Sequence, residues 1–300
     1  MNLPKLIEKY GSEDKCRAYL EELRWPDGVR CPRCESDKTS RIKTRGQFDC
    51  DGCRYQFSVT AGTLFHDSKL PLWKWFLAIY LITESKKGIS ANQLKRTLAV
   101  SYKTAWHLSH RIRSAMTEDD APLLRGIVEV DETYIGGKLG GFRNRQEAAK
   151  GRRANRTVVL GAIERGGRIR LRVAPDAKHN TIHAFLKDTI ADDAEAIYSD
   201  SHHSYRGAGD HNTRHEYVNH TAEEWVRGDV HTNTVESAWS LFDRAVIGSY
   251  HKLSAKHLPA YLNEFQFRFN NRENPYLFRD TLLRLVNGEA LPYRDLVHGG

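Results

Sequence analysis

Residues 126–134 read GIVEVDETY, and this stretch decides the fold class. Successive side chains of a β-strand point to opposite faces, and the two sets here are Ile127, Glu129 and Asp131 against Val128 and Val130. A carboxylate at the end of such a strand is poorly placed for a core and well placed to bind a hard cation. We therefore predict a strand that carries Asp131 near its end.

The chain beyond this strand alternates strands with helices. Residues 157–163 are rich in Val, Leu and Ile, and residues 169–173 alternate with arginine. Glycine-containing turns such as residues 165–167 predict that these three strands form an antiparallel meander. A helix is expected over residues 179–190, a strand over residues 196–199 and a helix from residue 230. This order predicts an α/β domain, a mixed sheet flanked by helices, with a mobile basic loop over residues 136–156.

Two more carboxylates stand where metal ligands could be placed. Asp200 ends the run AIYSD as Asp131 ends IVEVD, so adjacent strands would bring the two together. Glu236 lies in HTNTVESAWSLFDR, beside an inward stripe at helical spacing. Three such acids suit phosphodiester chemistry, because two Mg²⁺ ions ~4 Å apart can activate a nucleophile and stabilise a leaving oxygen.

A second interpretation of Glu236 stays open. Asn233 and Glu236 have the spacing of a capping box, in which the glutamate bonds back to the amide of the N-cap residue. From this segment alone the cap is the simpler hypothesis.

Four cysteines predict a zinc ribbon near the N-terminus. Residues 31–34 read CPRC and residues 50–53 read CDGC, a spacing that supplies four thiolates to one tetrahedral Zn²⁺. The residues between them are long enough for a hairpin around Arg45-Gly46, and Gly52 is expected at a positive φ in the second knuckle. Cys16 is expected to be a buried thiol on a helix over residues 13–23. The predicted zinc ligands are Cys31, Cys34, Cys50 and Cys53.

Residues 88–116 predict a helix-turn-helix. Ser90 and Ser101 can each cap a helix, and Leu98-Ala99-Val100 would form the turn. The start of the second helix would then enter the major groove of DNA, and a helical hairpin with a solvated basic face is the alternative. The DNA-contacting candidates, expected to be exposed, are Tyr102, Lys103, Thr104 and His107 here, with Arg33, Lys43 and Arg45 on the ribbon.

The composition agrees with a nucleic-acid partner. The 46 Lys and Arg exceed the 38 Asp and Glu, giving a net charge of +8 and a pI near 9.2, which favours a polyanion such as double-stranded DNA. No run is long enough to span a membrane and the first residues lack an apolar signal core, so we expect a cytoplasmic, nucleoid-associated protein. We predict three domains, residues 1–65 with the ribbon, 66–120 with the helix-turn-helix-like region, and 121–300 with the carboxylates.

Several motifs in one order resemble the DDE transposases of bacterial insertion sequences, in the ISXO-like branch that begins with a zinc ribbon. They are CPRC…CDGC, FSVTAGTLFHDSKLPLWKWF, VDETYIGGK, YSDSHHSYRG, HTNTVESAWSLFDR and YLNEFQFRFNNR, and they extend over nearly the whole chain. The resemblance implies an RNase H-like catalytic domain that cleaves transposon ends with Mg²⁺ or Mn²⁺ and transfers the freed strand to target DNA. It also implies at least a dimer on DNA.

The resemblance also assigns roles to residues. Asp131, Asp200 and Glu236 match the three catalytic carboxylates, which weakens the capping-box hypothesis. The expected supporting residues are Glu132, Asn233 and Trp239. Two other functions stay open: a zinc-dependent DNA-binding regulator that keeps the fold as a scaffold, and a metal nuclease without strand transfer.

Overall fold

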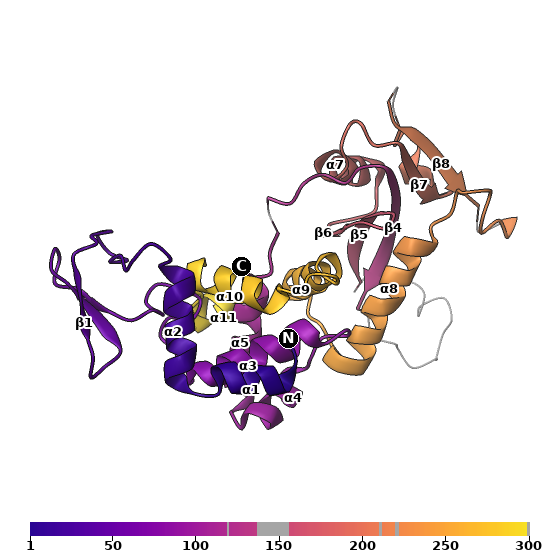
Figure 1. Cartoon of the computed structure of the whole chain (residues 1–300). Coiled ribbons are helices and arrows are strands. Elements are labelled where there is room, and N and C mark those ends of the chain that lie inside the picture. Colours follow the sequence, from indigo (N-terminus) through magenta and orange to yellow (C-terminus); the bar gives the residue numbers. More distant parts are fainter. Residues whose placement is uncertain (119, 137–155, 210–211, 220–221, 299–300) are drawn as a thin grey trace. The chain divides into compact units, whose positions relative to one another are not determined.

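The computed structural model describes residues 1–118, 120–136, 156–209, 212–219 and 222–298 (Figure 1). The chain divides into two compact units, Met1–Thr117 with Glu273–Gly300, and Glu118–Arg272. Residues 273–300, which the sequence analysis assigned to the third domain, thus group with the first unit. None of the helices in the described ranges has the length and apolar character needed to cross a bilayer.

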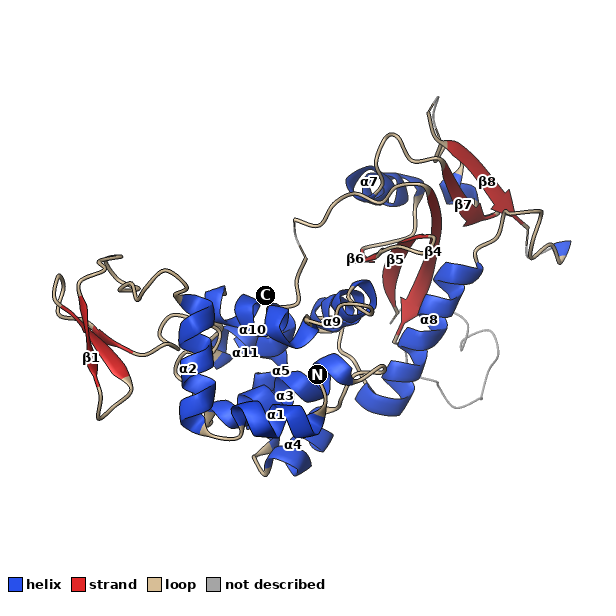
Figure 2. Ribbon diagram, viewed as in Figure 1, coloured by secondary structure: helices blue, strands red, loops and turns tan. Residues whose placement is uncertain are grey.

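The first unit is mainly helical with one small sheet (Figure 2). Its sheet is antiparallel in the order β1-β2-β3. Its elements are α1 (Leu3–Tyr10), α2 (Glu13–Arg24), β1 (Thr39–Ile42), β2 (Gln47–Cys50), β3 (Gln56–Phe57), α3 (Leu72–Glu84), α4 (Ala91–Leu98), α5 (Tyr102–Ser114), α10 (Leu277–Asn287) and α11 (Tyr293–His298).

Serine caps set the starts of three of these helices, as the sequence predicts for two of them. The hydroxyl oxygens of Ser12, Ser90 and Ser101 each accept a bond from the backbone N–H three residues on, which satisfies a donor that the helix itself cannot. Ala99 adopts a left-handed conformation at φ 50° and ends α4. The predicted pair of helices around this turn is confirmed.

The C-terminal helix α10 belongs to the first unit because its apolar face packs there. It contacts α2, α3 and α5. The ring of Phe278 lies 5.8 Å from Phe76 and 6.0 Å from Tyr10, measured between ring centroids. Sequence order gave no sign of this return, since the packing partners lie about two hundred residues upstream.

The second unit is an α/β domain around one five-stranded sheet of order β6-β5-β4-β7-β8. Strands β4, β5 and β6 are antiparallel, whereas β7 and β8 run parallel to β4. The predicted meander and mixed sheet are confirmed, and β8 is a strand that the sequence analysis did not predict. The elements are β4 (Ile127–Ile135), β5 (Thr157–Glu164), β6 (Ile169–Ala174), α7 (His179–Thr189), β7 (Ala196–Asp200), η1 (His203–Tyr205), β8 (Arg214–Val218), α8 (Asn233–Ala245), η3 (Val246–Tyr250) and α9 (Leu258–Asn270).

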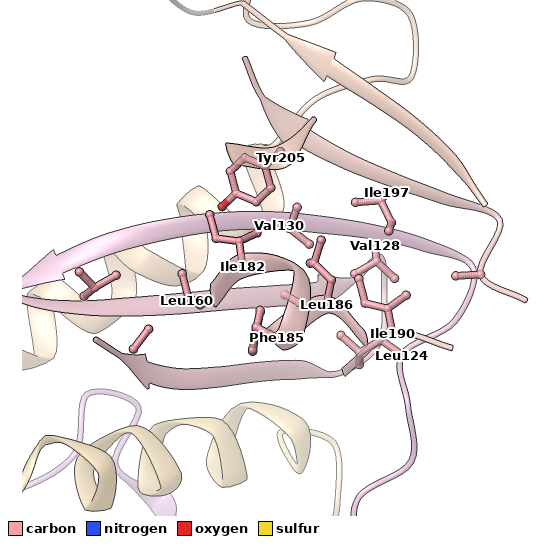
Figure 3. Packing of buried hydrophobic residues seen from close by; sticks show 14 residues of the cluster. Leu124, Val128, Val130, Leu160, Ile182, Phe185, Leu186, Ile190, Ile197 and Tyr205 are labelled. Atoms are coloured by element: carbon pink, nitrogen blue, oxygen red, sulfur yellow. The ribbon is translucent and has the colours of Figure 1, made fainter. Parts of the chain in front are cut away.

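Helices cover both faces of this sheet. On one face Val128 and Val130 of β4 pack with Phe185 and Leu186 of α7 (Figure 3). On the other face Val159 of β5 and its neighbours pack with residues of α8 and α9. The alternation of β4 therefore turns its valines toward α7 and its acids, Glu129 and Asp131, toward α8.

Two expectations about this unit need adjustment. The helix expected from residue 230 begins at Asn233, because Arg227 and Val230 form a β-bridge and Thr232 is the N-cap. The loop expected over residues 136–156 falls on residues 137–155, which lie outside the described residues.

Candidate active site and zinc centre

Asp131 and Asp200 lie on the neighbouring parallel strands β4 and β7. Asp200 is the last residue of β7, as predicted, but the prediction that Asp131 lies near the end of its strand was wrong, because β4 continues to Ile135 in its pairing with β5. The pairing of β4 with β7 matches Glu129 to Tyr198, and two further steps in this register place Asp131 beside Asp200. The two strands run in the same direction, so the middle of β4 lies beside the carboxyl end of β7, and the charge of Asp200 acts on Asp131. The predicted adjacency of the two strands is confirmed.

Asp131 sits in an environment rich in negative charge. Burial first, and then the nearby carboxylates of Glu132, Asp200 and Glu236, raise the pKa of Asp131 to about 8. The Trp239 indole N–H of α8 donates to Asp131 Oδ2 at 3.0 Å, so one oxygen is held in place by the helix. These acids destabilise one another's charged forms, and a divalent cation bound among them would reduce that repulsion.

Gly161 makes room for this tryptophan. It is the register partner of Asp131 on β5, and a Cβ added to it would lie 2.4 Å from Cζ2 of Trp239. Any side chain at position 161 would push the indole away from the sheet and from Asp131. Trp239, predicted as a supporting residue, thus contacts the first predicted carboxylate directly.

Glu236 lies in the first turns of α8 and is half-buried. The Thr232 hydroxyl donates to Glu236 Oε1 at 2.9 Å. The N-cap is Thr232, and Asn233 is the exposed first residue of the helix. The capping box with Asn233 as N-cap is therefore wrong in its geometry, since the carboxylate takes a side-chain hydroxyl from residue 232.

Glu129 is a buried acid whose role the sequence analysis missed. Its carboxylate accepts bonds from the N–H groups of Thr234 and Val235 at 2.7 and 3.1 Å, and from the Arg165 Nε at 2.7 Å. Its side chain is 0% exposed. A sequence signal was available, because Glu129 shares a face with Asp131 in an otherwise apolar strand.

Glu132 points to the opposite face of the sheet from Asp131. It accepts a bond from the Tyr205 hydroxyl at 2.7 Å. Burial raises its pKa, the Tyr205 bond lowers it, and the charge of Asp200 raises it. Asp200 in turn accepts the backbone N–H of His202 at 2.9 Å.

The four predicted zinc ligands converge in the first unit. One sulfur atom from each cysteine lies within 4.8 Å of all the others, and within the described residues no other set of three or more Cys, His or acidic groups is gathered as tightly. The Sγ–Sγ distances are 3.6 Å for Cys31–Cys53 and 3.5 Å for Cys34–Cys50. Four thiolates at such spacing fit one tetrahedral Zn²⁺.

The two knuckles use a left-handed residue after each pair of cysteines. Glu35 and Arg54 both have φ 57°, and their N–H groups donate to the carbonyls of Cys31 and Cys50 at 2.8 Å. The expectation of a positive φ at Gly52 was wrong, because the left-handed residue of the second knuckle is Arg54, two residues later. Cys16 is buried on α2 and its thiol contacts the Tyr10 carbonyl, as predicted.

Basic side chains are exposed on the ribbon. Lys43 and Arg45 lie in the β1–β2 turn, and Arg33 lies over the ring of Tyr55 at 4.0 Å from its centroid. Arg41 is instead paired with Glu21. The three predicted DNA-contacting residues of the ribbon are thus accessible.

At the start of α5, Tyr102, Lys103 and Thr104 are exposed, as predicted. His107 is a correction, because it is half-buried with its Nε2 3.1 Å from the Leu291 carbonyl oxygen. Burial lowers its pKa and the charges of Arg111 and Lys103 lower it further. The C-terminal segment of the same unit therefore covers this histidine.

A pocket of about 500 Å³ lies beside the start of α5. Lys69, Lys103 and Arg111 line it, and Asp67 offsets part of their charge. The guanidinium of Arg111 is buried and its Nε donates to the Leu291 carbonyl at 3.1 Å. The region around the predicted recognition helix is therefore basic.

Comparison with known proteins supplies the family. A family model described as "ISXO2-like transposase domain" matches residues 123–270, and one described as "Transposase zinc-ribbon domain" matches residues 11–56. A protein of transposable element ISH50 from Halobacterium salinarum is 32% identical over 276 residues, covering 87% of this chain and 92% of that protein. That relative is archaeal, so a bacterial source stays a prediction.

Among solved structures, a chain in the cryo-electron microscopy structure of the simian T-cell lymphotropic virus intasome with PP2A regulatory subunit B56 gamma aligns with 76% of this chain and 75% of its own length. The identity is 13% and the TM-score 0.28, values at which the likeness does not bear on the fold. The identity to the ISH50 protein along nearly the whole of both chains, with both family models matched in order, is decisive: this chain belongs to the transposases that join a zinc ribbon to an ISXO2-like transposase domain.

Proposed function

We propose that this transposase cuts the ends of its mobile element and joins the freed 3′-hydroxyl to target DNA, with Asp131, Asp200 and Glu236 as catalytic carboxylates on an RNase H-like domain. The observation that carries the proposal is the electrostatic grouping of these acids around Asp131, whose pKa is raised to about 8 by burial first and then by neighbouring carboxylates. Such a group is costly to a fold unless function requires it.

The three acids would hold two Mg²⁺ or Mn²⁺ ions. When bound, the ions supply Lewis-acid activation of the attacking oxygen and stabilisation of the leaving oxygen. The chain's own part is to hold the carboxylates: Asp131 by the Trp239 indole, Glu236 by the Thr232 hydroxyl, and Asp200 by the His202 N–H. Glu132, bonded to Tyr205, and Asn233, at the start of α8, are proposed to support this arrangement.

The reaction has two phosphodiester exchanges. Water first attacks at the element's end, and the bond to the 3′-oxygen breaks, leaving a 3′-hydroxyl. That hydroxyl then attacks a target phosphodiester, forming one P–O bond and releasing a target 3′-hydroxyl. Both steps replace one P–O bond by another, so no oxidant or energy cofactor is needed.

DNA recognition is proposed for the exposed residues of the first unit. On the ribbon they are Arg33, Lys43 and Arg45, and on α5 they are Tyr102, Lys103 and Thr104. His107 is left out because the C-terminal segment covers it. Two ends must be brought together before transfer, so we propose at least a homodimer on DNA, acting in the cytoplasm where the chromosome lies.

The test is a nicking and joining assay on the DNA that flanks the gene, with Mg²⁺ or Mn²⁺. Asp131→Ala, Asp200→Ala and Glu236→Ala should each reduce cleavage by at least about a thousandfold, the scale at which electrostatic catalysis is lost, with DNA binding kept. Asp243→Ala, an exposed acid on the same helix α8 as Glu236, is the matched control and should keep activity.

The outcomes separate the alternatives. Full activity in Glu236→Ala with loss in Asp243→Ala would move the third carboxylate to Asp243. Nicks without joined products would identify a nuclease. Specific binding with no metal-dependent nicking by the native chain would identify a regulator.

A further inference from the structure

We propose that Glu129, together with Arg165, is a positioning residue that fixes the helix of Glu236 against the strands of Asp131 and Asp200. The proposal rests on the function proposed above and adds to it the group that sets the geometry of the three acids. Glu129 lies on β4, two residues before Asp131, and faces α8.

Glu129 caps helix α8 from outside the helix. The first N–H groups of any helix have no partner within it, and the N-cap Thr232 makes no side-chain capping bond here. The Glu129 carboxylate accepts the N–H groups of Thr234 and Val235 at 2.7 and 3.1 Å, and the Thr234 hydroxyl at 2.8 Å. Its negative charge also complements the positive end of the helix dipole.

Arg165 extends this contact to β7, the strand that carries Asp200. From the turn between β5 and β6, its Nε donates to Glu129 Oε1 at 2.7 Å and its terminal nitrogen donates to the His231 carbonyl at 3.2 Å. The guanidinium carbon lies 4.9 Å from the ring centroid of Tyr198. Tyr198 is the register partner of Glu129 and lies on β7, two residues before Asp200.

Glu129 is saturated and is therefore no metal ligand itself. Oε1 accepts from Arg165 Nε and the Thr234 hydroxyl, and Oε2 accepts from two backbone N–H groups. A carboxylate has about four lone-pair positions, and all are used. Since its side chain is 0% exposed, the group acts through the elements that it joins.

The consequence for Glu236 is geometric. Glu236 directly follows Val235, the last residue that Glu129 holds, so loss of the cap would let the first turn of α8 shift. Displacement of a catalytic group by about 1 Å can cost about a hundredfold in rate. The distances from Glu236 to the two aspartates would then vary, and the metal-binding acids would lose their fixed spacing.

The experiment compares Glu129→Gln with Glu264→Gln. Gln keeps the shape but replaces one acceptor oxygen by a donor, which would face N–H or guanidinium donors. Glu264 is a matched control, because it is also 0% exposed in the same unit, with Arg268 3.2 Å away and a bond from the Tyr250 hydroxyl. Two measurements are made on the full chain: hydrogen exchange of the amides of Thr234 and Val235, and nicking kinetics.

We expect Glu129→Gln to speed exchange of those two amides at least tenfold and to lower kcat for nicking about a hundredfold, with KM for DNA within about twofold. Glu129→Asp, which keeps both oxygens, should recover part of kcat. Glu264→Gln should change neither the two amides nor kcat.

Unchanged exchange at Thr234 and Val235 in Glu129→Gln would overturn the proposal whatever the activity. Equal loss of kcat in Glu129→Gln and Glu264→Gln would reduce Glu129 to a general stabilising residue. Absence of nicking by the native chain would instead defeat the proposed function, and the exchange measurement would still decide whether Glu129 holds α8.

Discussion

At the scale of residues, Asp131, the first of the proposed catalytic carboxylates, lowers the stability of its own fold at neutral pH. In the unfolded chain an aspartate is charged above pH ~4, whereas in the folded protein burial, and then the nearby carboxylates, raise the pKa of Asp131 to about 8. Between these values the folded state binds more protons than the unfolded state, so this group makes stability fall as pH rises from about 4 to about 8. This proposed catalytic acid is therefore destabilising near neutral pH.

Asp131→Asn should stabilise the protein at pH 8 in buffer free of Mg²⁺ and Mn²⁺. The amide cannot ionise, and its oxygen can still accept the Trp239 indole N–H. One pKa unit corresponds to about 1.4 kcal/mol, and the pKa differs by about four units, so we expect a gain on the order of 5 kcal/mol at pH 8 and little at pH 4, measured by urea unfolding. Asp192→Asn, an exposed acid in the same unit, should show no such gain, and a variant no more stable than the native chain at pH 8 would contradict the argument.

At the scale of elements, we expect the zinc ribbon to depend on a bound metal more than on its small core. Its buried apolar residues are Phe48, Phe57 and Ala61 with two of the cysteines, and Trp25, Val29 and Tyr55 pack against them while only partly buried. Metal binding contributes about 10 kcal/mol or more to the folding of such modules. The strands β1 to β3 are too short to be stable alone.

Cys50→Ser should abolish zinc binding and unfold the ribbon, because Cys50 is a fully buried ligand. Zinc content should fall from one per chain to near zero, and amides of β1 and β2 should exchange freely, while those of β4 and β5 stay protected. Cys16→Ser is the control, since Cys16 lies on α2 with its thiol at the Tyr10 carbonyl and should leave zinc content at one. Retention of zinc by Cys50→Ser would remove that residue from the site.

Helix α5 offers a second test at this scale. Lys103 is exposed at its start, and each phosphate contact contributes about −0.9 to the slope of log K against log salt concentration. Lys103→Ala should therefore weaken binding to end DNA and make this slope less steep by about 1. Lys187→Ala, an exposed lysine on α7, should leave the slope unchanged; equal slopes for Lys103→Ala and the native chain would place α5 off the DNA.

At the scale of the whole molecule, the chain leaves its first unit, builds the second, and returns. Residues 273–300 complete the first unit, where α10 packs on α2, α3 and α5. The first unit is therefore discontinuous in sequence, while the α/β unit is formed by one continuous segment.

Truncation after Arg272 should destabilise the first unit and spare the second. Removal of Phe278, Leu282 and Leu285, each nearly fully buried, exposes apolar surface equivalent to several kcal/mol. Hydrogen exchange should show α2, α3 and α5 losing protection while β4 and β5 keep theirs. Loss of protection in both units to the same degree would show that the C-terminal segment also stabilises the α/β unit.

The sequence by itself determined the features that depend on neighbours in the chain. The cysteine spacing identified the four predicted ligands, and the serine caps fixed α4 and α5. The patterns in GIVEVDETY and AIYSD predicted the strands that carry Asp131 and Asp200, although only Asp200 lies at a strand end. Each of these follows from residue chemistry and a local period of 2 or 3.6. They were sufficient for four of the five strands of the larger sheet, for the ribbon and for two of the three proposed catalytic acids.

Only the tertiary structure decided which contacts position the helix of Glu236, the third proposed acid. The bond from Thr234 to Glu129 joins residues 105 apart, that from Trp239 to Asp131 residues 108 apart, and that from His107 to Leu291 residues 184 apart. No local pattern records such contacts, because they exist only once the sheet and helices have packed. The same packing places Glu129 of β4, in place of the predicted capping box, at the start of α8. It also places the C-terminal segment over His107, which had been predicted to contact DNA.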